Sequence, residues 1–224
     1  MRLQGTSPVA GTRLAHQVEG ERGRPALLLL QGQANSHQWW RRVRPLLTGD
    51  FRTITFDYRG TGETARRQSS VGVDPTPWTT RLFADDDAAV LAALGVDRAL
   101  VYGTSMGGRV AQELAINHPH LVERLVLCCT SPGGALARER SHEVRKALAD
   151  PDAARRHRSM VDLSYTPEWV AAQGRVRPRL GDRTMTPSDA NRHLRMSGEH
   201  DAFDEFAQPV TDLVGAFLSR RAFR

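Results

Sequence analysis

Apolar runs and amphipathic segments alternate along residues 26–130 of the chain. Short runs that are apolar or rich in β-branched residues have the composition of strands buried on both faces of a parallel sheet, and they lie at 26–30, 52–56, 98–102 and 122–128. The segments between these runs are predicted to be helices, at 38–47, 78–94 and 106–117. Alternation of this kind predicts an α/β fold with a mostly parallel sheet and right-handed crossovers.

The two ends of the chain follow other patterns. Residues 12–18 alternate weakly between polar and apolar, and the Glu-Gly-Glu-Arg-Gly run at 19–23 predicts a hairpin turn. Residues 206–218 have apolar positions at helical spacing and predict a terminal helix that packs on the sheet. After Gly133-Gly134 the chain is rich in Arg, lacks a run typical of a buried strand, and predicts short helices at 137–148, 153–163 and 187–196.

The composition is that of a globular chain with one core, because its 224 residues are 40% hydrophobic and 25% charged. The longest aliphatic run, Ala26–Leu30, is far shorter than the roughly 18 apolar residues of a membrane span. The first residues are not apolar enough for a secretory signal. Cys128 and Cys129 are adjacent and would point to opposite faces of a strand, so a disulfide is not expected. These features predict a cytoplasmic protein with no membrane partner.

The net charge of +6 raises the question of nucleic-acid binding. Of the 31 basic residues 30 are Arg, which is typical of a GC-rich coding bias, and residues 133–198 hold 13 Lys and Arg against 8 Asp and Glu. The sequence has no helix-turn-helix pattern, zinc-finger spacing or aromatic RNA-binding signature. We therefore expect no nucleic-acid partner.

The strongest chemical signal lies between the third buried run and the helix that follows it. Residues 103–108 read Gly-Thr-Ser-Met-Gly-Gly and match G-x-S-x-G in the strand-to-helix context that this motif requires. A serine at such a turn adopts a strained backbone, and its hydroxyl stands at the carboxyl edge of the sheet. The positive end of the following helix and the N–H of Met106 face any oxyanion formed there. We interpret Ser105 as a nucleophile; the alternative is a plain glycine-rich turn.

Three marks within residues 26–131 together resemble the α/β-hydrolase superfamily, in particular its small esterase, lactonase and peroxidase-like enzymes. Ser105 occupies the position of the nucleophile elbow. Residues 57–64, Asp-Tyr-Arg-Gly-Thr-Gly-Glu-Thr, match the D-x-R-G-x-G-x-S loop with Thr64 in place of Ser. Gln31-Gly-Gln33 follows the first buried strand, where the family usually has His-Gly-x. The resemblance implies a mostly parallel sheet flanked by helices, with an inserted helical lid.

The resemblance also implies an oxyanion hole, made by the backbone N–H groups of Gln33 and Met106. Gln31 departs from the commoner His. In the family that side chain mostly braces the loop, and we expect the amide of Gln31 to do the same.

A serine hydrolase needs a base that takes the Ser105 proton and an acid that orients the base. The superfamily order is Ser, acid, His, and His200 is our candidate for the base. In one alignment the chain is a compressed hydrolase and Asp182 is the acid, although no apolar strand precedes it. In the other, residues 186–204 are the end of the lid, the last strands are missing, and neither the acid nor the true base is present. The lack of an apolar strand between 131 and 205 favours the second alignment.

These inferences give a domain division and a function. Residues 1–132 form the hydrolase core, 133–198 the helical lid and 199–224 a C-terminal core helix. The predicted function is hydrolysis of a small carboxylic ester or lactone through an acyl-enzyme on Ser105, with His200 as base. The alternative is a degenerate or truncated α/β-hydrolase that binds a small apolar ligand or a partner without efficient catalysis. Because the cysteines and histidines lack metal-ligand spacing, no metal or organic cofactor is expected.

Overall fold

A computed structural model describes most of the chain: residues 2–68, 76–134, 137, 140–148, 150–172, 182 and 184–202. The terminal helix predicted at 206–218 lies outside the described residues. The chain divides into two compact units, Met1–Ala137 with Gly181–Arg224 and, separately, Arg138–Leu180. We describe each unit by itself.

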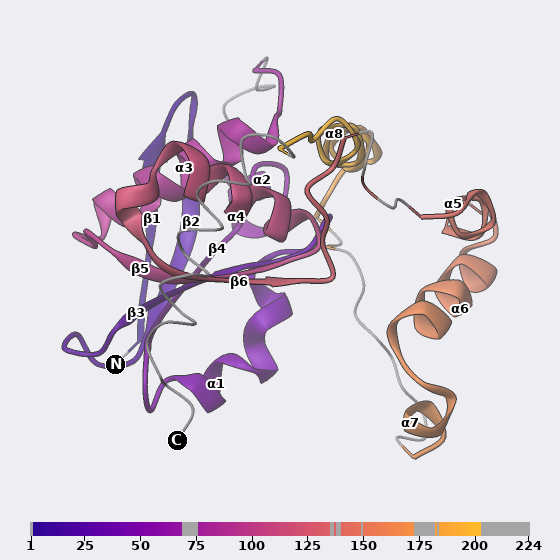
Figure 1. Cartoon of the computed structure of the whole chain (residues 1–224), viewed down its shortest axis with the longest axis horizontal. Helices are drawn as coiled ribbons and strands as arrows, with labels where there is room; N and C mark the ends of the chain where they lie inside the picture. Colours follow the sequence, from indigo (N-terminus) through magenta and orange to yellow (C-terminus); the bar gives the residue numbers. More distant parts are fainter. Residues whose placement is uncertain are drawn as a thin grey trace. The chain divides into compact units, whose positions relative to one another are not determined.

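The first unit is built on a mostly parallel sheet whose strands follow the order β1-β2-β4-β3-β5-β6 (Figure 1). Its strands are β1 (Arg2–Val9), β2 (Thr12–Glu19), β3 (Ala26–Leu30), β4 (Arg52–Phe56), β5 (Ala99–Thr104) and β6 (Val122–Cys128). The four strands from β3 to β6 are mutually parallel, whereas β1 and β2 form an antiparallel edge. The α/β fold and the four strands predicted at 26–30, 52–56, 98–102 and 122–128 are confirmed, but the burial predicted for the fourth is wrong, because in β6 only Val122 is buried and Val126 is 48% exposed. Among the described residues the sheet ends at β6.

The antiparallel edge differs from the sequence prediction. The hairpin turn predicted at 19–23 is wrong, because β2 pairs with β1 and β4 and not with β3. The hairpin forms instead at Ala10-Gly11, where Gly11 has a φ of 75°. β1 was not predicted because it is a largely exposed edge strand, and its polar sequence shows no apolar alternation.

Helices cover both faces of the sheet (Figure 1). On one face lie α3 (Thr80–Ala93) and α4 (Met106–Asn117), followed by the 3-10 helix η2 (Pro119–Leu121). On the other lie the 3-10 helix η1 (His37–Arg42) and one turn of helix α1 (Arg44–Leu47). The single helix predicted at 38–47 is therefore divided, since Pro45 has no N–H to continue the hydrogen-bond ladder. The short helix α2 (Gly62–Gln68) was not predicted.

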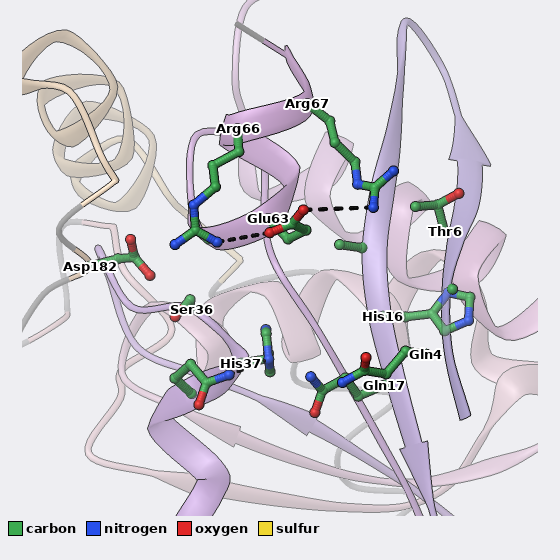
Figure 2. Close-up of a pocket in the computed structure, with 14 residues that line it drawn as sticks. Gln4, Thr6, His16, Gln17, Ser36, His37, Glu63, Arg66, Arg67 and Asp182 are labelled. Carbon is green, nitrogen blue, oxygen red and sulfur yellow. Dashed lines mark hydrogen bonds and ion pairs between the residues drawn. The ribbon is translucent and has the colours of Figure 1, made fainter. Parts of the chain in front are cut away.

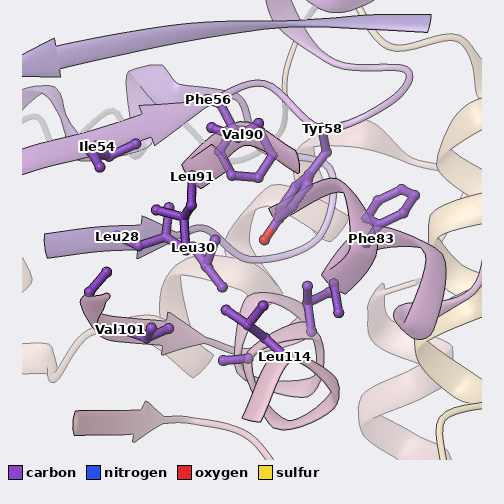
Figure 3. Close-up of a cluster of buried hydrophobic side chains, with 14 of the residues drawn as sticks. Leu28, Leu30, Ile54, Phe56, Tyr58, Phe83, Val90, Leu91, Val101 and Leu114 are labelled. Atoms are coloured by element: carbon purple, nitrogen blue, oxygen red, sulfur yellow. The ribbon is translucent and has the colours of Figure 1, made fainter. Parts of the chain in front are cut away.

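The core fills the space between the sheet and α3 and α4 (Figure 3). Its strand residues include Leu28, Leu30, Ile54, Phe56 and Val101, and its helix residues include Val90, Leu91, Val110 and Leu114. All of them are buried. This packing fixes the carboxyl ends of β3, β4 and β5 beside one another, so the loops that leave these ends lie at one edge of the sheet.

Helix α8 (Pro187–Gly198) belongs to the first unit, although it lies within the range predicted for the lid. Its His193 and Met196 are buried. The second unit holds α5 (His142–Leu148), α6 (Ala153–Ser164) and α7 (Pro167–Ala172). The carboxylate of Asp152 caps α6 by accepting from the backbone N–H of Ala154 and Arg155.

Candidate functional site

Ser105 lies in a sharp turn between β5 and α4. Its φ of 54° and ψ of −123° place an L-residue in the positive-φ region, which non-glycine residues rarely adopt. The turn is held by backbone hydrogen bonds: Ser105 N–H donates to the Cys128 carbonyl over 2.9 Å, and Gly108 N–H donates to the Ser105 carbonyl over 2.9 Å. This is the geometry that the G-x-S-x-G pattern predicted.

Glycine is required on both sides of Ser105 by close packing. A Cβ on Gly103 would lie 2.6 Å from the Gly107 carbonyl oxygen. A Cβ on Gly107 would lie 2.5 Å from the carbonyl oxygen of Leu30, and one on Gly108 would overlap the side chain of Thr130. The absence of these side chains lets the first turn of α4 approach the end of β3.

The loop after β3 lies directly against Ser105. A Cβ on Gly32 would be 3.3 Å from the Ser105 Cβ. Gln31 is buried and braces this loop, as expected from the sequence. Its Nε2 donates to the Phe56 carbonyl over 2.9 Å, and its Oε1 accepts from Trp40 Nε1 over 3.3 Å.

The predicted oxyanion donors belong to these two segments. Gln33 follows Gly32 in the loop after β3. Met106 is the first residue of α4, and the N–H groups in the first turn of a helix have no acceptor within the helix. The positive end of the helix dipole is at the same place. The structure thus brings the Gln33 and Met106 segments to Ser105.

Asp57 joins the loop after β3 to the glycine-rich loop after β4. Its Oδ1 accepts from the backbone N–H of His37 over 2.7 Å and lies 2.6 Å from His37 Nδ1. Its Oδ2 accepts from the N–H of Glu63 over 2.8 Å. The D-x-R-G pattern marked this loop, but nothing in the sequence indicated that His37 pairs with Asp57.

His200 lies away from Ser105. Its side chain is fully buried, with Nδ1 3.0 Å from Thr80 Oγ1 and 3.4 Å from Glu113 Oε1. Nε2 lies 3.4 Å from Gln112 Oε1. Burial alone would raise the pKa of Glu113, but its hydrogen bond and charge interaction with His200 contribute to a net lowering.

This placement does not support His200 as the base. Gln112 and Glu113 lie two helical turns beyond Ser105, about 10 Å along the axis of α4. A general base must come within hydrogen-bond reach of the proton that it takes. Within the described part of the chain, no hydrogen bond joins the Ser105 hydroxyl to a histidine ring, so the structure corrects the assignment of His200.

Asp182, the candidate acid, has other partners. Its backbone N–H donates to the Ala34 carbonyl over 2.6 Å, and its Oδ1 accepts from the N–H of Thr184 over 2.7 Å. Burial raises the pKa of this carboxyl, but hydrogen bonds from Ser36 and Thr184 lower it overall. The structure does not bring Asp182 and His200 together as an acid–base pair.

A cavity of about 720 Å³ opens beside the loop after β3 and is framed by β1, β2, η1 and α2 (Figure 2). Residues that line it include His16, His37, Arg66 and Asp182; Ser105 does not line it. Glu63 pairs there with Arg66 over 2.8 Å and with Arg67 over 3.6 Å. The cavity therefore gives no candidate for the reacting centre.

His193 is a site residue that the sequence did not mark. It projects from α8, with Nε2 2.9 Å from the Arg59 carbonyl oxygen, and its Nδ1 accepts from the Ala34 N–H over 3.4 Å. Both partners are backbone groups, so no pattern of side chains could have revealed them.

Comparison with known proteins places this geometry in a family. A family model described as alpha/beta hydrolase fold matches residues 25–218. The chain belongs to the α/β-hydrolase family. A hydrolase from Pseudomonas aeruginosa PA01 superposes with a TM-score of 0.66 at 24% identity, covering 89% of this chain and 74% of that one. This second likeness concerns the α/β-hydrolase fold alone.

Two of the curated relatives are named for different reactions. The protein named "Putative carbamate hydrolase RutD" from Pseudomonas syringae pv. syringae (strain B728a) is 32% identical over 163 residues, which cover 70% of this chain and 58% of the relative. A fluoroacetate dehalogenase from Burkholderia sp is 32% identical over 124 residues, covering 55% of this chain and 40% of the relative. The chain thus spans about half the length of these relatives.

Two features are absent from the part of the chain that the structure describes. None of its helices is long and apolar enough to cross a membrane. Within the same residues, no group of three or more His, Cys, Asp or Glu side chains is placed to hold a metal ion.

Proposed function

We propose that this α/β-hydrolase cleaves a small carboxylic ester or lactone through an acyl-enzyme on Ser105. The observation that carries the proposal is the strained backbone of Ser105 at the turn between β5 and α4. Strain of this kind persists only where the surrounding structure enforces it, and it clusters at functional positions. Here the enforcing contacts are the glycine approaches and the hydrogen bond to the Cys128 carbonyl.

In the proposed reaction the Ser105 oxygen attacks the carbonyl carbon as its hydroxyl loses its proton, and the oxyanion of the tetrahedral intermediate accepts hydrogen bonds from the N–H groups of Gln33 and Met106. Removing one such donor from a hydrolase typically reduces kcat about 10²- to 10³-fold. The approach of Gly32 to Ser105 supports this arrangement, because it sets the loop that carries Gln33 beside the nucleophile. The tetrahedral intermediate then collapses to the acyl-enzyme: the C–O bond to the alcohol breaks, and the alcohol oxygen takes up the proton that Ser105 lost. Water then releases the acid from the acyl-enzyme. The RutD relative is named for a carbamate, which also presents a carbonyl carbon to a nucleophile.

A second candidate function is supported by the position of His200. The His200 ring is hydrogen-bonded to α3 and α4, and Ser105 has no histidine partner among the described residues. A degenerate hydrolase that binds a small apolar ligand or a partner, with little turnover, is consistent with that placement. Triad members act as a unit, so loss of the base removes most of the rate. For either function we propose a cytoplasmic location and a small-molecule ligand, without nucleic-acid or membrane partners.

Labelling with a fluorophosphonate separates the two functions, since it requires an activated serine. We expect one adduct per chain, at Ser105, identified by peptide mass spectrometry and lost in Ser105→Ala. Ser164→Ala, which changes an exposed serine at the end of α6, is the matched control and keeps the label. A folded wild-type protein that takes no label refutes the enzyme and leaves the ligand-binding protein. For a labelled protein, hydrolysis of p-nitrophenyl acetate and γ-butyrolactone then tests the substrate class.

A further inference from the structure

Ala34, next to Gln33, has a φ of 57°. Alanine rarely adopts this left-handed conformation, because its Cβ is crowded by the backbone. Ala34 is held by hydrogen bonds at both ends of its residue: its N–H donates to His193 Nδ1 over 3.4 Å, and its carbonyl accepts from the Asp182 N–H over 2.6 Å. The Ala34 N–H belongs to the peptide group that joins Gln33 to Ala34. The orientation of this peptide group therefore depends on His193 of α8 and on Asp182 in the segment before α8.

The hydrogen bond from Ala34 requires one particular form of His193. The Arg59 carbonyl can only accept, so His193 Nε2, 2.9 Å away, carries the proton. In the neutral ring Nδ1 then has a free lone pair, which accepts from Ala34. Burial lowers the pKa of His193 to about 4, which keeps the ring neutral at ordinary pH.

Aromatic packing fixes the plane of the same ring. Its centroid lies 5.3 Å from that of Trp78 and 5.5 Å from that of Phe83. The Tyr58 ring is 6.4 Å away, nearly perpendicular. The ring therefore has one orientation, one protonation state and two backbone partners.

We propose that His193 is a positioning residue: through the Ala34 N–H it holds the loop after β3 so that the Gln33 N–H points at the oxyanion formed on Ser105. This proposal rests on the proposed acyl-enzyme function. It gives α8 an indirect role in the oxyanion hole, exerted through the loop after β3. An interaction of this kind acts on the transition state, so its loss lowers kcat and leaves KM nearly unchanged.

Two variants separate hydrogen bonding from packing. His193→Phe keeps an aromatic ring among Tyr58, Trp78 and Phe83 but can neither donate to Arg59 nor accept from Ala34. His193→Gln keeps one donor and one acceptor on a flexible side chain. In His193→Phe we expect amide hydrogen exchange of a peptide spanning residues 31–36 to quicken at least tenfold, and kcat for p-nitrophenyl acetate to fall about tenfold with KM unchanged. His193→Gln is expected to recover part of both losses.

The exchange measurement keeps this proposal separate from the proposed function. If wild type hydrolyses no ester, the proposed function fails, while exchange in residues 31–36 still reports whether His193 holds the loop. The proposal is overturned if a folded His193→Phe protein has the same exchange rate in residues 31–36 and the same kcat as wild type. It is also overturned if His193→Phe and His193→Gln change both quantities equally. If His193→Phe does not fold, His193→Gln decides: slower exchange than in His193→Ala supports the proposal, and equal exchange overturns it.

Discussion

Arg59 and Asp86 form a bidentate ion pair inside the protein, with Nε–Oδ2 at 2.7 Å and Nη2–Oδ1 at 2.8 Å. Their side chains are 0% and 3% exposed. The pair fixes the glycine-rich loop after β4 to α3, and so places the carbonyl of Arg59 that accepts from His193. Removing the Asp86 carboxylate leaves the buried Arg59 charge without this counter-charge, although its Nη2 still donates to the Ala10 carbonyl over 2.7 Å. We expect Asp86→Ala to lower the free energy of unfolding by about 3–5 kcal/mol, measured by urea denaturation.

The exposed pair between Arg66 and Glu63 provides the control for that experiment. Its side chains are 62% and 42% exposed, so water already solvates both charges. Glu63→Gln should leave the urea midpoint close to that of wild type. An Asp86→Ala protein as stable as Glu63→Gln would contradict a structural role for the buried pair.

Asp87 predicts a distinctive pH dependence of stability. Its carboxylate is fully buried, and neither oxygen has a hydrogen-bond partner among the residues that the structure describes; burial, and then the charge of Asp86, raise its pKa well above the usual value. The folded state therefore keeps a proton that the unfolded state releases above about pH 4. This proton therefore makes its full contribution to the free energy of unfolding below about pH 4. The contribution is lost as the pH rises toward the raised pKa of Asp87.

The measurement compares unfolding free energies of wild type and Asp87→Asn from pH 4 to pH 8. Wild type should lose stability relative to the variant as the pH rises, because Asn cannot ionise. Asp85→Asn, at a side chain 47% exposed on the same helix, is the control. A constant difference between wild type and Asp87→Asn across this range would show that Asp87 is ionised in the folded protein.

How much of this molecule could be predicted from its sequence depends on the range of the contacts involved. The buried strands and the Ser105 turn follow from local patterns, since a fully apolar run and a G-x-S-x-G turn each specify their own conformation. β1 and α2 were missed because exposed elements carry little hydrophobic signal. His200 was misassigned because order along the chain says nothing about which face of α4 its ring meets. His193 was missed because its partners are the backbone groups of Ala34 and Arg59.

His200 is expected to stabilise the fold and to leave the chemistry of Ser105 unaffected. His200→Gln removes a ring that contacts Thr80, Gln112 and Glu113, so unfolding should become easier by about 1–3 kcal/mol. The rate of fluorophosphonate labelling per folded molecule should stay within about twofold of wild type, measured by mass spectrometry at a temperature where both proteins are folded. His157→Gln, at an exposed position on α6, controls for the loss of an imidazole. A fall in labelling of a hundredfold or more in His200→Gln would restore His200 as the base.

Gly107 tests whether the close approach of α4 to β3 creates the site. Ala at this position would put a Cβ 2.5 Å from the Leu30 carbonyl oxygen and 2.6 Å from that of Gln31, and both obstacles are backbone. Either the first turn of α4 or the loop after β3 must then move, which separates Met106 from Gln33. Because a displacement of about 1 Å can reduce a rate about 10²-fold, we expect labelling of Ser105 to slow by at least tenfold in Gly107→Ala. Gly23→Ala, whose Cβ would meet nothing within 4 Å, should label at the wild-type rate. Equal rates in the two variants would mean that Ser105 reacts without the two N–H groups assigned to its oxyanion.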